Sequence, residues 1–364
     1  MCGSTGLFIG CTALSSCPLN ALLLGTGTAT PADPRTGQHG REGSYHSPFR
    51  HWDRQASVRQ RPRRKLATDH ASEYFPPELV PVASLPEVRA LPPEQFSQLM
   101  LRHLYRYLRF TIVLESQYVN PVALGLYEHG WGLPLPDAMR ADALAIYTDE
   151  AYHALLSSDL MRQAEVRSGV SSRIGYQPAF TWRLAGLAPR AELRGLLPLL
   201  FAIVSETLIT ASLSEIPHHA SVDAGVRDAV RDHALDEGRH YSYFASVLRW
   251  LWPALKPDQR IKLGLLVPDL IRTFLEPDTR AVLADLTEAG LSAAEAERLQ
   301  HLVLTSEHTR SQYAAVAASS VRAFESVGTL DEPRVRDAFE AAGLLPTAPE
   351  VLSETDGGAD DRRR

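Results

Sequence analysis

Glutamate and histidine residues recur at helical spacing in two stretches of the sequence. Glu150 and His153 lie three residues apart in AIYTDEAYHALL, and Glu237 and His240 repeat that spacing in RDHALDEGRHYSYF. Residues three or four apart share one face of a helix, so each pair can direct a carboxylate and an imidazole at one point. Oxygen and imidazole ligands without sulfur suit iron or manganese, so the pairs are candidate metal ligands.

Two further glutamates lie inside apolar stretches that predict helices. Glu115 interrupts FTIVLESQYV, and Glu206 is the only ionisable residue in LLPLLFAIVSETLITASL (196–213). A helix that is apolar on every side offers no wet face for a carboxylate. Burying an unpaired carboxylate costs several kcal/mol, and pairing or metal binding is the usual remedy. The alternative is that the glutamates and histidines of all four stretches simply lie on solvent-exposed helix faces. Glu206 is the strongest evidence against that alternative.

The four positions form a repeated plan. Glu150 follows Glu115 by 35 residues and Glu237 follows Glu206 by 31, so each half of the plan corresponds to one helical hairpin. The order Glu, Glu-x-x-His, Glu, Glu-x-x-His is the ligand plan of di-iron and di-manganese carboxylate bundles. Four carboxylates can neutralise two divalent ions, and two imidazoles complete the shells.

Charged neighbours of these residues suggest supporting roles. Asp149 and Asp236 each precede a glutamate of the plan, where they could accept the proton of a ligating histidine on the facing helix. Arg239 could pair with one of these acids; the alternative for all three is an ordinary exposed charge. His233 lies one turn before Glu237 on the same face, and taken alone it predicts a core histidine bonded to a backbone carbonyl.

The positioning elements are predicted to be helices. From Pro93 to about Gly343, Ala/Leu/Arg-rich segments alternate with short Pro/Gly breaks, and no β-branched alternation indicates a sheet. We therefore predict an all-α fold, a ferritin-like (ribonucleotide-reductase-like) four-helix bundle core with additional C-terminal helices. The expected divisions are a poorly ordered extension (1–75), a helical metal-binding domain (76–345) and a disordered tail (346–364).

Within the extension, the basic run RQRPRRK (59–65) is interpreted as a solvated linker, and YFPPELVPVASLP as an arm that lies on the domain. The net charge of −6 gives no sign of a nucleic-acid partner. All three cysteines lie in the first seventeen residues, which excludes a zinc–thiolate site or a cysteine nucleophile from the body. The N-terminal stretch lacks a basic region and no later run is long enough to cross a bilayer, so we expect a soluble, cytoplasmic protein without a membrane partner.

The sequence resembles the p-aminobenzoate N-oxygenase (AurF-like) family of di-iron arylamine oxygenases. The resemblance rests on Glu115, DEAYH (149–153), Glu206 and HALDEGRH (233–240), in that order, and it covers residues from about 95 to 250 directly. A third histidine ligand distinguishes this family, and His233 is its counterpart here. The resemblance thus changes the prediction for His233, from a core histidine to a seventh metal ligand.

The resemblance implies a ligand assignment and a reaction. Glu150 and Glu237 would bridge two iron ions, with manganese as the second choice of metal. The coordination of one ion would be completed by Glu115 and His153, and that of the other ion by Glu206, His233 and His240. With O₂ as co-substrate and an external electron donor, a homodimeric enzyme would oxidise an arylamine through hydroxylamine towards nitro, in antibiotic or other natural-product biosynthesis. Candidate substrate residues are Tyr107 and Arg310 for a carboxylate, and Tyr118, Tyr241 and Phe244 for the pocket wall, with plain structural roles as the alternative.

Three other functions fit parts of the pattern. A di-iron C-hydroxylase or desaturase would share the plan, and only His233 argues against it. A radical-generating reductase subunit needs a tyrosine one turn after the first ligand histidine, where this chain has Ser157. A ferritin-like metal-binding protein without turnover would be shorter, and the helices after residue 255 are typical of the wall of a substrate pocket.

Overall fold

The computed structural model describes residues 45–67, 72–172, 176–189 and 193–345. Within these ranges it consists of helices and connecting loops without any strand, and the one bridge found pairs Glu73 with Val222. The predicted all-α, ferritin-like class is confirmed. The expectations of disorder for residues 1–44 and for the tail fall outside the described residues.

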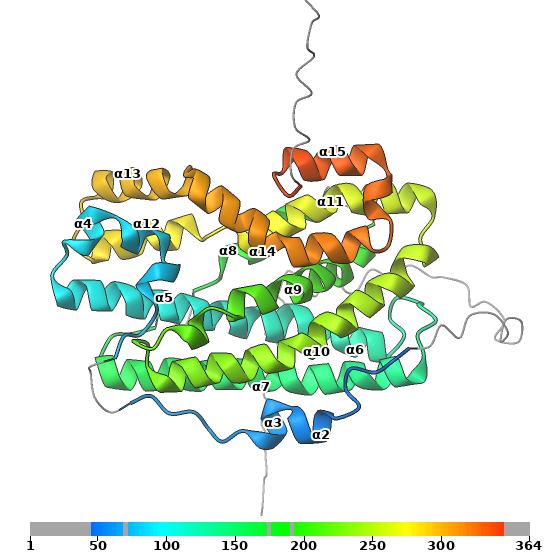
Figure 1. Ribbon diagram of the computed structural model, residues 1–364, viewed down its shortest axis with the longest axis horizontal. Coiled ribbons are helices and arrows are strands. Elements are labelled where there is room, and N and C mark those ends of the chain that lie inside the picture. The colour runs from blue at the N-terminus through cyan, green and yellow to red at the C-terminus, as the bar shows by residue number, and fades with distance from the viewer. Residues whose placement is uncertain (1–44, 68–71, 173–175, 190–192, 346–364) are drawn as a thin grey trace, which may run out of the picture.

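Four long helical segments form the core of the bundle (Figure 1). They are α5 (Pro93–Leu114), which runs on through the π-helical segment η3 (Glu115–Val119) into α6 (Asn120–Tyr127), then α7 (Asp137–Ser168), α9 (Leu197–Leu213) and α10 (Ala224–Ala254). The α5 and α6 helices pack on α7, and α9 packs on α10. Each of the two predicted hairpins is therefore present as a packed pair of helices.

Local signals explain where the core helices begin and end. The side chain of Asp223 caps α10 by accepting a hydrogen bond from the Gly225 amide at 2.8 Å. The α7 helix ends at Gly169, whose φ of 69° is the left-handed conformation that favours glycine. The α9 helix is apolar on all sides and is surrounded by other helices, so its burial follows directly from its composition.

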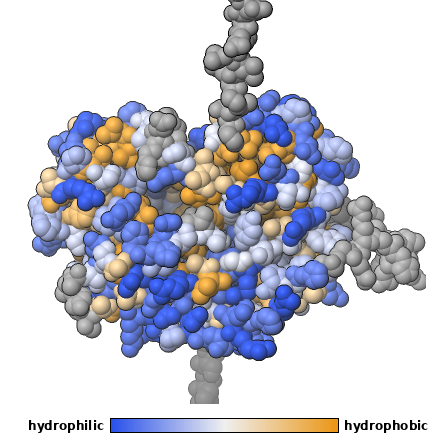
Figure 2. Space-filling view, viewed as in Figure 1, coloured by the Kyte–Doolittle hydropathy of each residue, from blue (hydrophilic) through white to orange (hydrophobic). Residues whose placement is uncertain are grey.

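The C-terminal helices cover the bundle on the side away from α7 (Figure 1). They are α11 (Pro257–Leu275), α12 (Thr279–Glu288), α13 (Ala293–Leu304), α14 (Glu307–Glu325) and α15 (Pro333–Ala341), with α8 (Ala179–Leu187) beside α11. Two hydroxyl contacts join α14 to α9, since Ser319 donates to the carbonyl of Thr207 and the Thr207 hydroxyl donates to Ser320. Figure 2 shows apolar patches over these upper helices, whereas the surface over α7 and α10 is mostly hydrophilic.

The first described segment, residues 45–67, forms an N-terminal arm that lies along α7 and α10, on the opposite side from the C-terminal helices (Figure 1). It contains two short helices, α2 (Trp52–Gln55) and α3 (Ser57–Gln60), and the chain then continues through η1 (Pro77–Leu79), η2 (Pro81–Ser84) and α4 (Pro86–Arg89). The remaining short helical turns are η4 (Arg194–Leu196), η5 (Ile216–His218) and η6 (Thr329–Asp331).

The helical domain begins earlier than the expected boundary at residue 76, because Phe49 and Ala56 are already buried against the bundle.

The basic run at 59–65 is also not a free linker. Arg63 pairs with Asp159 of α7 at 2.6 Å, and Arg64 pairs with Asp232 of α10 at 2.6 Å. Acidic residues on two helices therefore hold the arm in place. The interpretation as a solvated linker missed this because the partners lie about 100 and 170 residues further along the chain.

Gly225 provides a test of how closely the arm is packed. A Cβ atom at this position would lie 2.2 Å from the carbonyl oxygen of Lys65, a backbone atom that cannot rotate away. We expect Gly225→Ala to lower the free energy of unfolding by about 1–3 kcal/mol, the usual cost of overpacking. Gly238→Ala on the same helix is the control, because nothing lies within 4 Å of its Cβ. Thermal unfolding should show destabilisation for the first variant only, and equal melting temperatures would contradict the close contact.

Candidate metal centre

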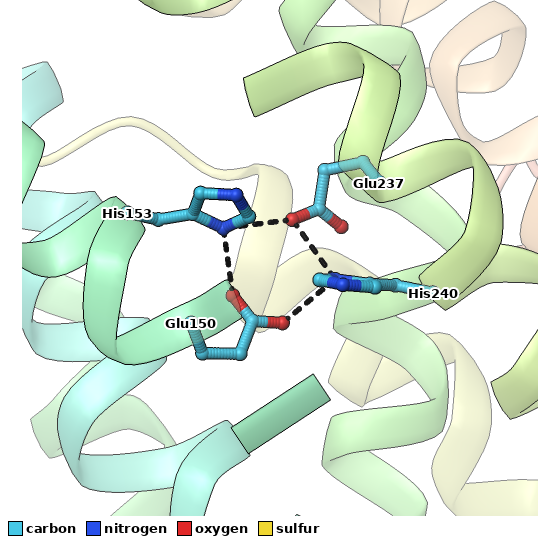
Figure 3. A group of neighbouring side chains, drawn as sticks. All are labelled: Glu150, His153, Glu237 and His240. Carbon is cyan, nitrogen blue, oxygen red and sulfur yellow. Dashed lines mark hydrogen bonds and ion pairs between the residues drawn. The ribbon is translucent and has the colours of Figure 1, made fainter. Parts of the chain in front are cut away.

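Four of the predicted ligands meet between α7 and α10 (Figure 3). The Nδ1 atom of His153 lies 3.0 Å from Glu150 Oε2 and 3.5 Å from Glu237 Oε1. The Nδ1 atom of His240 lies 2.9 Å from Glu150 Oε1 and 3.3 Å from Glu237 Oε1. The four side chains are 0–1% exposed, so their polar atoms face one another and not water.

The other three predicted ligands flank this group. His233 Nε2 lies 3.0 Å from Glu237 Oε1 and 3.7 Å from Glu115 Oε1, and Glu206 Oε2 lies 3.7 Å from His240 Nδ1. Two sets of side chains therefore have ligand atoms close enough to surround one ion each, namely Glu150, His153, Glu237, His240 and Glu115, Glu150, His233, Glu237. The two sets share Glu150 and Glu237, the residues expected to bridge.

The position of His233 differs from the expected one. The resemblance assigns it to the ion of Glu206 and His240, but its contacts are with Glu115 and Glu237, and its ring lies 4.0 Å from that of His153. Helical rise gives the physical reason. His233 precedes His240 by seven residues, or about 10.5 Å along the helix axis, so it reaches the opposite end of the carboxylate cluster.

A π-helical turn presents Glu115 to the cluster. In η3 the amide of Asn120 donates to the carbonyl of Glu115, five residues earlier, where an α-helix would use a partner four residues away. Pro121 follows at once and has no N–H with which to continue the α-helical ladder. π-Helical turns occur often at functional sites, and this one contains a proposed ligand.

The hydrogen bonding of the cluster tests whether it fits metal ions. Both carboxylate oxygens of Glu115 and of Glu206 are buried and find no hydrogen-bond donor, and the same holds for Glu237 Oε2. Buried polar atoms are otherwise almost always satisfied, and a buried carboxylate without a partner is costly. Two divalent cations would supply the missing partners and balance four negative charges. The residues present therefore fit a two-metal site.

The pKa shifts in the cluster agree with this interpretation. Burial raises the pKa values of Glu115 and Glu206 well above the usual range, and the charges of neighbouring carboxylates raise them further. Burial would also raise the pKa of Glu150, but the histidines beside it outweigh burial and lower it. Without a metal, part of this cluster must therefore hold protons.

Each of the two central histidines is held by an aspartate of the other helix. The Nε2 atom of His153 lies 3.1 Å from Asp236 of α10, and that of His240 lies 3.3 Å from Asp149 of α7. Arg239 also donates to Asp236 and lies 3.7 Å from Asp149. A carboxylate that accepts the second N–H of an imidazole fixes its tautomer and turns the other nitrogen towards the ion.

Sequence reasoning missed two donors from the N-terminal arm. The indole Nε1 of Trp52 lies 2.9 Å from both oxygens of Asp149. The backbone amide of Ser57 lies 3.2 Å from both oxygens of Asp236. Both residues lie in a Ser/Arg/His-rich stretch without hydrophobic periodicity, so no local pattern in the sequence indicated them.

The candidate substrate residues are only partly described. The Tyr107 hydroxyl is buried without a hydrogen-bond partner, and burial together with the charges of Glu115 and Glu237 raises its pKa. Tyr118 packs edge-on against Phe180, with ring centroids 5.1 Å apart. Phe244 is fully buried and Tyr241 partly so. The side chain of Arg310 lies outside the described part of the chain.

Comparison with known proteins identifies the family. A family model described as "P-aminobenzoate N-oxygenase AurF" matches residues 40–328. The chain belongs to this family. A similar protein, the 4-aminobenzoate N-oxygenase of Streptomyces thioluteus, is 26% identical over 227 residues, which are 61% of this chain and 67% of that protein. This AurF-family chain is thus an oxygenase, as the resemblance implied. Among the helices of the described residues, none is long and apolar enough to cross a membrane.

The buried histidines predict an unusual pH dependence for the metal-free protein. Burial alone would lower the pKa of His153, but hydrogen bonds to Asp236 and Glu150 outweigh it and raise the pKa to about 10. A group whose pKa is raised by folding stabilises the fold below its unfolded pKa and loses that contribution as the pH rises. The raised pKa values of Glu115 and Glu206 act in the same direction.

We therefore expect the melting temperature of metal-free protein to fall as the pH rises from about 6.5 towards 9. Metal ligands must be deprotonated, so added Fe²⁺ or Mn²⁺ should remove this decline and bind more tightly at the higher pH. Differential scanning calorimetry with and without metal measures both effects. A metal-free melting temperature that is constant or rises over this range would contradict the prediction.

Proposed function

We propose that this protein is a non-haem di-iron N-oxygenase that uses O₂ to convert an arylamine to a hydroxylamine or nitro product. The observation that carries the proposal is the third histidine, His233, whose imidazole faces Glu115 and Glu237 within the four-carboxylate cluster. Carbon-hydroxylating and desaturating relatives of this bundle share the four-glutamate, two-histidine plan. An additional neutral donor is therefore the feature that favours nitrogen oxidation.

The proposed ligands are Glu115, Glu150, His153, Glu206, His233, Glu237 and His240. Glu150 and Glu237 belong to both of the four-residue sets described above and would bridge the ions. The other five residues would complete the coordination of the two ions. Burial lowers the pKa of His233, so its imidazole is neutral and can donate an electron pair to a metal. Bound iron supplies the activation of O₂ that amine oxidation requires, and an external donor supplies the electrons.

The family and the named relative support an aminobenzoate as the substrate class. Within the described residues, the Tyr107 hydroxyl is a buried group near the cluster whose hydrogen-bonding capacity is unused. Phe75 lies against Tyr107, with ring centroids 5.7 Å apart, and supplies an apolar surface beside it. We propose that Tyr107 donates to the carboxylate of the substrate. Arg310 remains a second candidate for binding the substrate carboxylate. We also propose that the protein is a homodimer.

The function is tested by incubating the reduced, iron-loaded protein with O₂ and a panel of aminobenzoates and anilines. Mass spectrometry should detect hydroxylamino and nitro products that carry ¹⁸O from labelled O₂. Products hydroxylated on carbon would favour the alternative oxygenase. Iron that is bound and oxidised without product formation across the panel would favour a storage protein.

A further inference from the structure

We infer that the N-terminal arm from Phe49 to Ser57 completes the metal centre, with Trp52 and the Ser57 amide acting as positioning groups for its two central histidines. The inference rests on the proposed metal site and goes beyond it, because neither group can touch a metal. Each acts through an aspartate. The arm is outside the four-helix bundle, so this part of the site comes from a segment that the ligand plan does not contain.

The first connection runs from Trp52 to His240. The indole N–H lies 2.9 Å from both oxygens of Asp149, and Asp149 lies 3.3 Å from His240 Nε2. Asp149 and His240 are fully buried, whereas Trp52 is half-buried. A carboxylate buried in this way has few positions open to it, and a donor shared between both oxygens restricts its rotation.

The second connection runs from Ser57 to His153. The Ser57 amide lies 3.2 Å from both oxygens of Asp236, which lies 3.1 Å from His153 Nε2. Ser57 is the first residue of α3, where the backbone N–H has no partner within the helix. The Ser57 hydroxyl donates separately to the carbonyl of Asp232 at 3.0 Å. The amide and the hydroxyl of one residue therefore make different contacts and can be tested apart.

The two connections cross. Each imidazole is held by an aspartate on the facing helix, and each aspartate is held by the arm. Phe49 adds a packing contact, because its ring is stacked 5.9 Å from that of His240 at an interplanar angle of 16°. Both histidines thus present Nδ1 to the carboxylate cluster and Nε2 to an aspartate. The arm sets the orientation of two ligands without contributing a ligand itself.

Trp52→Phe removes the N–H donor and keeps an aromatic ring. We expect it to weaken the binding of Co²⁺, used alone as the probe, by about 10-fold at one of two sites, the lower end of the range for residues that hydrogen-bond a ligand directly, because Trp52 acts through Asp149. The visible d–d absorption of the bound Co²⁺ should shift as well, because the orientation of His240 changes. Trp182→Phe is the control, since Trp182 is 49% exposed on α8 and contacts Arg183 and Arg280.

Ser57→Pro and Ser57→Ala form a second, matched pair. Proline lacks the amide N–H but suits the first position of a helix, and the extended conformation of Ala56 (φ −62°, ψ 136°) is compatible with a following proline. Alanine keeps the N–H and loses only the hydroxyl. We expect weaker Co²⁺ binding and a changed spectrum for proline, with alanine close to the unmodified chain.

The outcomes separate this inference from the proposed function. If the unmodified chain binds no Co²⁺, the proposed metal centre fails. If it binds two ions, and folded Trp52→Phe and Ser57→Pro variants bind them with unchanged affinity and spectrum, the arm has no positioning role. Loss of folded protein in both variants, judged by circular dichroism, would also overturn the inference, because the arm would then serve the fold and not the metal site.

Discussion

Glu206→Leu is expected to abolish metal binding while raising the melting temperature of the metal-free protein. Glu206 is fully buried in the apolar α9 helix, and neither of its oxygens finds a hydrogen-bond donor. A buried acceptor without a donor carries an uncompensated desolvation cost of about 1–3 kcal/mol, and the neighbouring carboxylates of Glu237 and Glu150 disfavour its charge further, so an apolar side chain of similar volume should be stabilising. Removing a direct ligand should lower metal affinity by at least about 100-fold, the upper end of the range for supporting residues.

The opposite signs of these two effects make the experiment decisive for a ligand. A carboxylate that serves only packing or structure would lower stability when replaced and would leave metal content unchanged. Metal analysis and calorimetry on the same preparations measure both quantities. Glu215→Leu is the control, because Glu215 lies just after α9 and is exposed. Stoichiometric metal in the Glu206→Leu protein would count against the whole ligand set.

His233→Ala is expected to weaken the binding of one metal ion and to lose N-oxygenation even when enough metal is added to fill both sites. Six of the seven proposed ligands remain in this variant, including the four that meet around Glu150 and Glu237. The missing imidazole is a neutral donor at the Glu115 end of the cluster, where Nε2 lies 3.7 Å from Glu115. We expect the rate of nitro or hydroxylamino formation to fall by at least about 100-fold, which single-turnover assays with quantified metal would measure.

A restoration experiment separates ligation from packing in the same variant. Added imidazole can enter the space left by the side chain, and should partly restore the rate if a nitrogen donor is what is missing. His301→Ala is the control for loss of a histidine, because His301 is exposed on α13. Unchanged N-oxygenation by folded His233→Ala protein would show that the third histidine does not determine the reaction.

The fold class and the helices that carry the cluster follow from local sequence features. Glu206 alone among apolar residues, and two Glu-x-x-His pairs at hairpin spacing, required inward-facing carboxylates and hence a bundle with a polar centre. Helical periodicity is a local property, so it can be recognised without knowing the partners. The same reasoning named Asp149 and Asp236, which lie one residue before two of the glutamates.

The remaining parts of the site depend on long-range contacts. Trp52 reaches Asp149 across 97 residues and Ser57 reaches Asp236 across 179, and nothing near either residue encodes its partner. Helical rise separates His233 from His240, but the carboxylates that His233 meets also depend on how α10 packs on α7. Periodicity shows which face a residue takes, but the packing of one helix on another decides what that face meets.

The π-helical turn at Glu115–Val119 uncouples two requirements that one straight helix would have to meet together. A π-helical turn closes its hydrogen bond one residue later than an α-helical turn, and one residue corresponds to a rotation of about 100°. The face of α6 that buries Val122 and Leu126 is therefore set independently of the direction in which Glu115 points. The additional residue in the turn thus allows Glu115 to face the carboxylate cluster while α6 keeps its apolar face against α7.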